Sequence, residues 1–255
     1  KAGDLLQIEL RPTPQSQAFK PEVMALDVVF EDDYLMVINK PAGLVVHPAP
    51  GNWSGTLLNG LLGRDDAMRF LPRAGIVHRL DKDTSGLMVV AKTREAMDRL
   101  VEMIAARTVN RDYLAVGHKE WLGPRQQHVA LPIGRDPRNR LRMAVVDLER
   151  NSGKTALTDI SLIDNQDDFC LVRCKLYTGR THQIRVHMAS LGHPLVYDAL
   201  YGGEPAVGLK RQALHARRLG FEHPVSGEAL AFVAPVPDDL ESAMAELGLS
   251  YNGRS

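Results

Sequence analysis

The chain has 255 residues, of which 44% are hydrophobic, and its 31 basic and 31 acidic side chains give a formal net charge of zero. This length and composition allow a large core in one or two domains, and the net charge alone gives no sign of a nucleic-acid-binding protein. No run of 18 apolar residues is present, so we expect no membrane-spanning helix.

The charged residues are nevertheless grouped along the chain. Basic residues form three groups: Arg135, Arg138, Arg140 and Arg142; Arg173, Lys175, Arg180 and Arg185; and Lys210, Arg211, Arg217 and Arg218. Acidic residues gather elsewhere, around positions 31–33, 164–168 and 238–241. Segregated charge can give a neutral protein one positive face. An even mixture of charges over the surface is the alternative.

Short strands are the commonest predicted element. Residues 3–10 alternate between apolar and polar side chains like a strand, whereas residues 11–20 contain two prolines and are typical of a linker. Further strands are predicted at residues 34–38, 87–91, 113–116, 156–163 and 169–176. Because several strands follow one another without an intervening helix, the pattern favours an α+β fold over a doubly wound sheet.

A polar turn stands between two apolar segments. Nine residues that read HRLDKDTSG follow the apolar end of a predicted strand at 76–77. From Asp81 the turn matches the first half of a calcium-binding loop, but Lys92 stands where such a loop needs a bidentate Glu. A structural turn in which Asp83 and Ser85 bond the backbone is the stronger alternative. A turn held between strands is also a common place for catalytic groups.

Two helices are predicted from their caps and apolar periodicity. Thr93 caps the first, whose apolar face consists of Met97, Leu100, Val101 and Ile104. Thr181 caps the second, and Gly192 followed by Pro194 ends it. The buried stripe of this second helix consists of Ile184, Met188 and Leu191.

The second helix begins beside Arg180. Its first backbone N–H groups and this arginine suit a phosphate group. His182 and Arg185 are three residues apart and share a face away from the buried stripe. An ordinary amphipathic helix with solvated arginines is the alternative.

The two cysteines are Cys170 and Cys174. On a strand at 169–176 they would lie on one face, roughly 13 Å apart, which is too far for a disulfide. Two buried free thiols suit a reducing compartment, and we therefore expect a cytoplasmic protein.

Several motifs together resemble one known family. They are residues 38–44 with 47–48, then 78–86, 111–115, 178–187, 214–216 and 223–224. In this order they resemble the RluA/RluD-type RNA pseudouridine synthases, and residues 72–81 resemble the RluD branch in particular. The resemblance extends from about residue 27 to about residue 237.

The resemblance implies a bent, mostly antiparallel mixed sheet with flanking helices and a central RNA-binding cleft. It also implies that residues 1–20 are the remnant of a small N-terminal RNA-binding domain with its linker, and that residues 21–255 are the catalytic domain. Pseudouridine formation detaches uracil from ribose and rejoins it through carbon 5 without gain or loss of atoms, so no cofactor or metal is expected. Histidines with the i, i+4 spacing and acidic partner of a zinc helix are also absent.

Three catalytic residues follow from the resemblance. Asp81 would act on the ribose as a nucleophile or as a base, and the sequence leaves both roles open. Arg185 would pair with Asp81, lower its pKa and orient it. Tyr113 would stack on uracil, and its hydroxyl could help to remove the carbon 5 proton. Without the family, Tyr113 is interpreted as a strand tyrosine in the core.

The remaining site residues implied by the resemblance contact the base or the RNA. Leu80 and Leu214 would line the uracil pocket. Arg79 would enter the space left by the flipped base, although the residues alone suggest a salt bridge to Asp81 or Asp83. The other expected RNA contacts are Arg180, His182, Lys40 and His47, of which the last two either touch the RNA backbone or only stabilise a turn.

We therefore expect an RNA pseudouridine synthase that modifies large-subunit ribosomal RNA, as a monomer, on a stem-loop or a pre-ribosomal particle. Transfer RNA is the alternative substrate. A non-catalytic RNA-binding or ribosome-assembly protein is the alternative of a different class, and replacement of Asp81 or Arg185 would favour it. Both residues are present.

Overall fold

The computed structural model describes residues 13–253, whose strands form one large and one small sheet. The large sheet has the order β1-β2-β3-β11-β4-β10-β9-β5, and β12 pairs with β11. These strands are β1 (Val28–Glu31), β2 (Leu35–Lys40), β3 (Ser85–Ala91), β4 (Asn110–His118), β5 (Gln126–Val129), β9 (Thr158–Asn165), β10 (Phe169–Leu176), β11 (Leu214–Glu222) and β12 (Ala229–Val233). Within the described residues only the β3–β11 pairing is parallel, which confirms the predicted α+β fold with a mostly antiparallel sheet.

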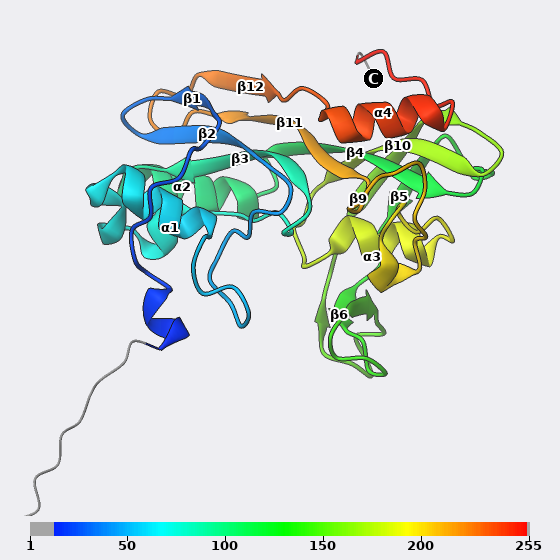
Figure 1. The fold of residues 1–255 in the computed structure, drawn as a ribbon, viewed down its shortest axis with the longest axis horizontal. Coiled ribbons are helices and arrows are strands. Elements are labelled where there is room, and N and C mark those ends of the chain that lie inside the picture. The colour runs from blue at the N-terminus through cyan, green and yellow to red at the C-terminus, as the bar shows by residue number, and fades with distance from the viewer. Residues whose placement is uncertain (1–12, 254–255) are drawn as a thin grey trace, which may run out of the picture.

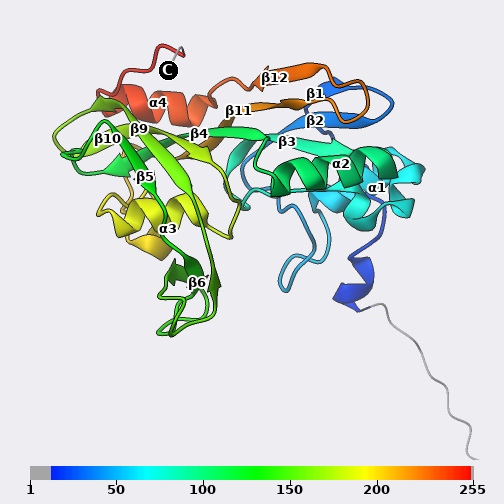
Figure 2. The same ribbon diagram turned by 180° about the vertical axis from the view of Figure 1, so that it is seen from behind.

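Helices cover both sides of this sheet. They are α1 (Leu57–Arg64), α2 (Arg94–Ala105), α3 (Gln183–Ser190) and α4 (Asp238–Glu246). Figures 1 and 2 show α1, α2 and α3 on one side and α4 on the other. The small sheet, made of β6 (Ile133–Arg135), β7 (Met143–Val145) and β8 (Gly153–Lys154), projects as an arm on the α3 side. No helix in the described part of the chain is long and apolar enough to cross a membrane.

The core lies against both faces of the sheet, and β3 contributes to both. Every residue of β3 is buried. Met88 and Val90 belong to the cluster on one face, whereas Leu87 and Val89 belong to the cluster on the other. A strand buried on both faces reads as an unbroken apolar run. This is why residues 87–91 could be predicted as a strand.

The other long strands also lie where the sequence predicts them, namely at β2, β4, β9 and β10. The short strand predicted at 76–77 is wrong, because only Ile76 pairs there, in an isolated bridge with Val90. Arg73 and Ala74 have φ values of 54° and 50°. The chain therefore turns sharply before Ile76 and runs on into the polar turn without forming a strand.

The helix α2 begins where Thr93 predicts it, since the Thr93 hydroxyl accepts a backbone N–H of the first turn at 3.2 Å. Leu100 is fully buried, and Met97 and Ile104 pack partly buried against the same cluster. Val101 is 45% exposed, so its predicted place in the apolar face is wrong. It lies about 100° around the helix from Leu100, outside the narrow stripe that meets the sheet.

The helix α3 ends as predicted, with Gly192 at a φ of 87° directly after the C-cap Leu191. Glycine adopts this left-handed conformation without steric cost. Ile184 and Met188 are buried and Leu191 packs partly buried against the same core, which confirms the predicted stripe.

The start of α3 differs from the prediction. His182, with a φ of 56°, is the N-cap residue in place of Thr181. The left-handed turn at His182 separates Thr181 from the first helical turn. Gln183 fixes this turn instead, since its side-chain oxygen accepts the N–H of Arg180 at 3.0 Å and the hydroxyl of Thr178 at 2.7 Å.

Residues 13–20, predicted as part of a linker, are attached to α1. The Asn59 side chain donates to the backbone oxygens of Gln17, Ala18 and Lys20 at 3.2, 3.4 and 2.9 Å, and Ala18 is buried. The predicted remnant of an N-terminal domain falls mainly on residues 1–12, which lie outside the described residues. The division into residues 1–20 and 21–255 therefore stays a prediction.

The two cysteines are buried in β10 and carry free thiols, as their spacing predicts. Burial raises the pKa of the Cys170 thiol to about 12 and also raises the pKa of Cys174. Both thiols are therefore protonated at neutral pH and unreactive.

Candidate active site

The predicted catalytic residues line one pocket. It is formed by the turn before β3, by β4, by the start of α3 and by the first residue of β11. Its walls include Asp81, Tyr113 and Arg185, together with Leu80 and Leu214. Arg79, Arg111, Arg180 and His182 line it as well. Residues more than 100 positions apart in the sequence thus meet at one point of the fold.

The turn that carries Asp81 is fixed from behind by Lys40. This side chain is only 1% exposed. Its ammonium donates to the backbone oxygens of Pro41, Leu44 and Lys82 at 2.8, 2.9 and 3.0 Å. Burial lowers the pKa of Lys40 to about 7, although the carboxylates of Asp83 and Asp81 raise it. Of the two roles left open for Lys40, the structure supports stabilisation of the turn, because the ammonium is enclosed in the protein by these three carbonyl groups.

The Asp81 carboxylate is held by Arg185. Nη1 of Arg185 donates to Oδ2 of Asp81 at 3.1 Å, while its Nε and Nη2 donate to the two carboxylate oxygens of Asp198 at 2.7 and 2.8 Å. Burial by itself lowers the pKa of Arg185, but Asp198 and then Asp81 outweigh it and raise this pKa above its ordinary value. The arginine is therefore charged at every accessible pH.

A second contact with Asp81 comes from His182. Its Nε2 lies 3.9 Å from Oδ1 of Asp81, and its Nδ1 shares a hydrogen bond of 2.8 Å with the hydroxyl of Tyr201. The Tyr201 ring also lies 5.0 Å from the guanidinium of Arg185. Burial lowers the pKa of His182, so the ring is mostly neutral at neutral pH. The structure turns His182 toward Asp81 and Tyr201, whereas the sequence predicts a contact with RNA.

Asp198 and Tyr201 were not identified from the sequence. Nothing in the local pattern distinguishes Asp198 from other acidic residues. A search for a second partner of the buried Arg185 would have been the available signal, since a buried guanidinium needs more than one acceptor.

Tyr113 combines the two roles considered for it. Its side chain is 5% exposed and belongs to the core cluster, and it also lines the pocket with Asp81. Burial raises the pKa of Tyr113 to about 12. Leu80 and Leu214 are each 4% exposed and complete an apolar wall beside it. The pocket therefore combines one carboxylate and several basic side chains with an apolar and aromatic surface.

The expected RNA-binding residues lie at the rim. Arg79 is exposed, and no ion pair among the described residues joins it to Asp81 or Asp83. Arg180 lines the same pocket, and its Nε donates to the backbone oxygen of Thr155 at 3.0 Å. His47 lies in a neighbouring cavity, where burial followed by the charges of Arg79 and Arg73 lowers its pKa to about 4.

The calcium alternative for the turn loses its support. Ser85 shares a hydrogen bond of 2.9 Å with His215, and Lys92 pairs with Glu31 at 3.0 Å. Both side chains therefore have partners within the protein. In the described part of the chain, no three His, Cys, Asp or Glu side chains are grouped as a metal would require.

The comparison with known proteins settles the family. A family model described as RNA pseudouridylate synthase matches residues 34–190, which is more than half of the chain and includes Asp81, Tyr113 and Arg185. The chain belongs to the RNA pseudouridylate synthase family. The resemblance seen in the sequence motifs is thereby confirmed, and the enzyme is an isomerase that converts uridine in RNA to pseudouridine.

Individual relatives agree with this family. Proteins named ribosomal large subunit pseudouridine synthase D from Neisseria meningitidis serogroup A and Xanthomonas campestris are 50% and 47% identical to it. Each alignment covers 97% of this chain, and 68% and 76% of the two relatives. The solved structure of human RNA pseudouridylate synthase domain containing 1 is 27% identical, with a TM-score of 0.65, and the alignment covers 84% of each chain.

Proposed function

We propose that this pseudouridine synthase modifies uridines of large-subunit ribosomal RNA, and that Asp81 is its catalytic carboxylate. The observation that carries the second part is the geometry at Asp81: it is the one carboxylate that lines the pocket, it is oriented by the buried Arg185, and Tyr113, Leu80 and Leu214 line the same pocket. A fixed anion in such surroundings is suited to react at the ribose carbon from which uracil departs.

The reaction needs no group beyond the side chains of the pocket. The bond between uracil N1 and ribose C1′ breaks, the base turns, a bond forms between C5 and C1′, C5 loses its proton, and N1 gains one, either directly or through solvent. Asp81 either attacks C1′ or takes a proton from the ribose. Arg185 holds Asp81 in its orientation in either case.

The pocket walls account for retention of the base while it is detached. The Tyr113 ring provides a flat surface on which uracil stacks, with Leu80 and Leu214 on the other sides. Because the pKa of Tyr113 is about 12, its hydroxyl is protonated at neutral pH. Tyr113 therefore acts first as a stacking surface, and it removes the C5 proton only if another group accepts the phenolic proton.

The rim arginines take part in binding the strand. A uridine in a stem-loop leaves its stack at a cost of a few kcal/mol. Arg79, which is exposed at the mouth of the pocket, is placed to fill the vacated space, and Arg180 contacts a phosphate. Positive side chains of the β6–β8 arm, such as Arg138 and Arg140, add further phosphate contacts.

The choice of ribosomal over transfer RNA rests on the relatives, whose names specify the large ribosomal subunit. The enzyme then works in the cytoplasm as a monomer, on a ribosomal RNA stem-loop or on a pre-ribosomal particle.

The decisive experiment is position-by-position mapping of pseudouridine in the RNA of cells that lack the gene. We expect one or a few large-subunit positions to lose the modification, and we expect the wild-type gene but not Asp81→Asn to restore it. Loss confined to transfer RNA would overturn the substrate assignment. Unchanged modification throughout would favour the non-catalytic alternative.

A further inference from the structure

A buried arginine near the active site lacks the partners that a buried charge needs. Arg111, on β4, is 5% exposed, and its Nε and Nη2 have no hydrogen-bond partner. Burial lowers its pKa, and the one opposing influence is the nearby Tyr113. An enclosed guanidinium without an anion costs free energy. A site of this kind is completed when an anion binds.

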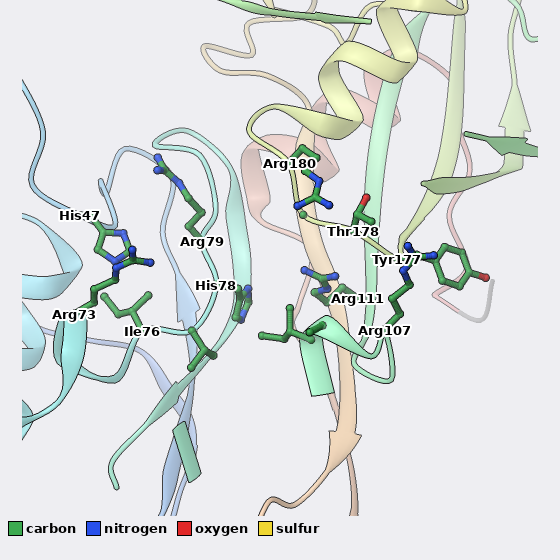
Figure 3. Close-up of a pocket in the computed structure, with 14 residues that line it drawn as sticks. His47, Arg73, Ile76, His78, Arg79, Arg107, Arg111, Tyr177, Thr178 and Arg180 are labelled. Carbon is green, nitrogen blue, oxygen red and sulfur yellow. The ribbon is translucent and has the colours of Figure 1, made fainter. Parts of the chain in front are cut away.

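Arg111 faces a cavity that has a strong excess of positive charge. The cavity has a volume of about 360 Å³ and is lined by five arginines, Arg73, Arg79, Arg107, Arg111 and Arg180, and by no aspartate or glutamate. Figure 3 shows Arg111 on the same side of the cavity as Arg180 and Thr178, across from His47 and Arg73. Arg111 lies on β4 and the other four arginines lie in connections between strands and helices, so their charges meet only in the folded protein.

The two histidines of this cavity do not add to its charge. Burial, then Arg79 and Arg73, lower the pKa of His47 to about 4, and burial, then Arg111, lower the pKa of His78 to about 3. Both rings are therefore neutral at neutral pH. The positive charge of the cavity rests on guanidinium groups, whose planar forks match the oxygens of a phosphate.

Gly179 keeps one side of Arg111 open. A Cβ atom at this position would lie 3.0 Å from Nη1 of Arg111. The φ angle of Gly179 is outside the left-handed range, so the backbone does not itself require glycine there. What the glycine provides is space beside the guanidinium, through which a ligand atom can approach.

We propose that this cavity binds a backbone phosphodiester of the substrate RNA, next to the target uridine, with Arg111 as the main donor. The inference deepens the proposed function and rests on it. Arg79, Arg111, Gly179 and Arg180 line both this cavity and the active-site pocket. A phosphate held there belongs to a neighbouring nucleotide, and it fixes the position of the strand while the uridine occupies the pocket with Asp81.

The test uses a ribosomal RNA stem-loop in which each phosphate around the target uridine is replaced in turn by an uncharged methylphosphonate. Affinity is measured by fluorescence anisotropy. We expect one replacement to weaken binding to the wild-type enzyme by about tenfold. The Arg111→Met variant should bind the unmodified RNA more weakly by a similar factor. Its affinity should not fall further when that phosphate is replaced. Arg111→Lys should recover part of the loss, because it restores the charge but not the fork.

Two further variants and a stability measurement distinguish phosphate binding by Arg111 from a purely structural role. Arg99→Met removes an exposed arginine of α2 that pairs with Glu102, and it should bind every RNA as the wild type does. Gly179→Ala should weaken binding through the same phosphate, because its methyl group approaches Arg111. The thermal midpoint of RNA-free Arg111→Met should be unchanged or higher, since no partner is lost.

The proposal is overturned if Arg111→Met remains sensitive to the same methylphosphonate as the wild type. It is also overturned if this variant unfolds at a clearly lower temperature while it binds RNA normally, since Arg111 would then be structural. Addition of inorganic phosphate to the wild type should compete with the RNA; equal competition in Arg111→Met would place free phosphate elsewhere and contradict the assignment. None of these measurements depends on turnover. If the RNA is bound in this way but not isomerised, the proposed function fails and the binding site stands.

Discussion

Asp198 accepts hydrogen bonds from both Nε and Nη2 of Arg185, at 2.7 and 2.8 Å, and thereby leaves Nη1 of that arginine for Asp81. The Asp198 side chain is 1% exposed, and that of Arg185 is 9% exposed. Because both charges are enclosed, each depends on the other for compensation. The catalytic carboxylate is thus oriented by an arginine that is itself oriented by a second, more deeply buried carboxylate.

Asp198→Asn should therefore reduce turnover without affecting RNA affinity. The amide keeps the shape but cannot accept at both oxygens, so Arg185 loses its fixed direction. We expect the single-turnover rate to fall by about tenfold or more and the free energy of unfolding to fall by roughly 3 kcal/mol. Rapid-quench kinetics and urea denaturation measure the two effects.

The control for Asp198→Asn is Asp98→Asn, whose carboxylate pairs with Arg94 on the exposed side of α2. A surface pair of this kind contributes less than about 1 kcal/mol. Equal single-turnover rates in the two variants would mean that Asp198 has no positioning role.

Substitution of Arg185 and of Arg180 by methionine should affect different properties: the first the rate of the reaction, the second the affinity for RNA. Arg185→Met releases Asp81, so the single-turnover rate should fall by about 100-fold with bound RNA. Arg180→Met should leave that rate nearly unchanged but weaken binding and reduce the salt slope by about one. Affinities measured at several salt concentrations, together with single-turnover rates, distinguish the two. If both variants affected binding alone, this division of roles would be wrong.

Lys40 should produce a measurable dependence of stability on pH. Its pKa is about 7 in the folded protein and near 10.5 in the unfolded chain. Between these values the unfolded state binds one more proton, so this residue makes stability rise with pH, by at most about 1.4 kcal/mol per unit. The contribution of neutral Lys40 to the free energy of unfolding is complete above the pKa of the unfolded chain. It is lost as the pH falls through about 7.

The comparison is between wild type and Lys40→Met, by urea denaturation at pH 7 and pH 9. The free energy of unfolding of the variant should lack the Lys40-dependent increase between pH 7 and pH 9. The variant should also be less active, since three backbone oxygens of the loops around Asp81 lose their donor. The same increase between pH 7 and pH 9 in both proteins would show that the Lys40 ammonium stays protonated over this range.

Much of the fold could be predicted from the sequence because local patterns determine it. The unbroken apolar run of β3, the Thr93 cap of α2 and the Gly192 end of α3 each depend on a few adjacent residues. The start of α3 could not be predicted, because Gln183 replaces a Thr181 cap only when the chain makes a left-handed turn at His182.

The contacts between distant residues were the least predictable part of the site. Arg185 meets Asp81 across 104 positions, and the motif resemblance supplied that pair. Asp198 lies outside these motifs, and Arg111 lies in the motif at 111–115 without an assigned role. The importance of both residues rests on burial and on the presence or absence of partners in three dimensions. Lys40 shows the reverse, since a basic residue that suggests an RNA contact is enclosed by three carbonyl groups.

The central claim, that Asp81 is the catalytic carboxylate, is tested most directly by Asp81→Asn, with Asp83→Asn as a control from the same turn. The measurement is pseudouridine formed per bound RNA in a single turnover, with affinity determined in parallel. The account predicts that Asp81→Asn binds RNA nearly as the wild type does but forms no product, while Asp83→Asn remains active. Product above a few per cent of the wild-type amount in a pure Asp81→Asn preparation would contradict it.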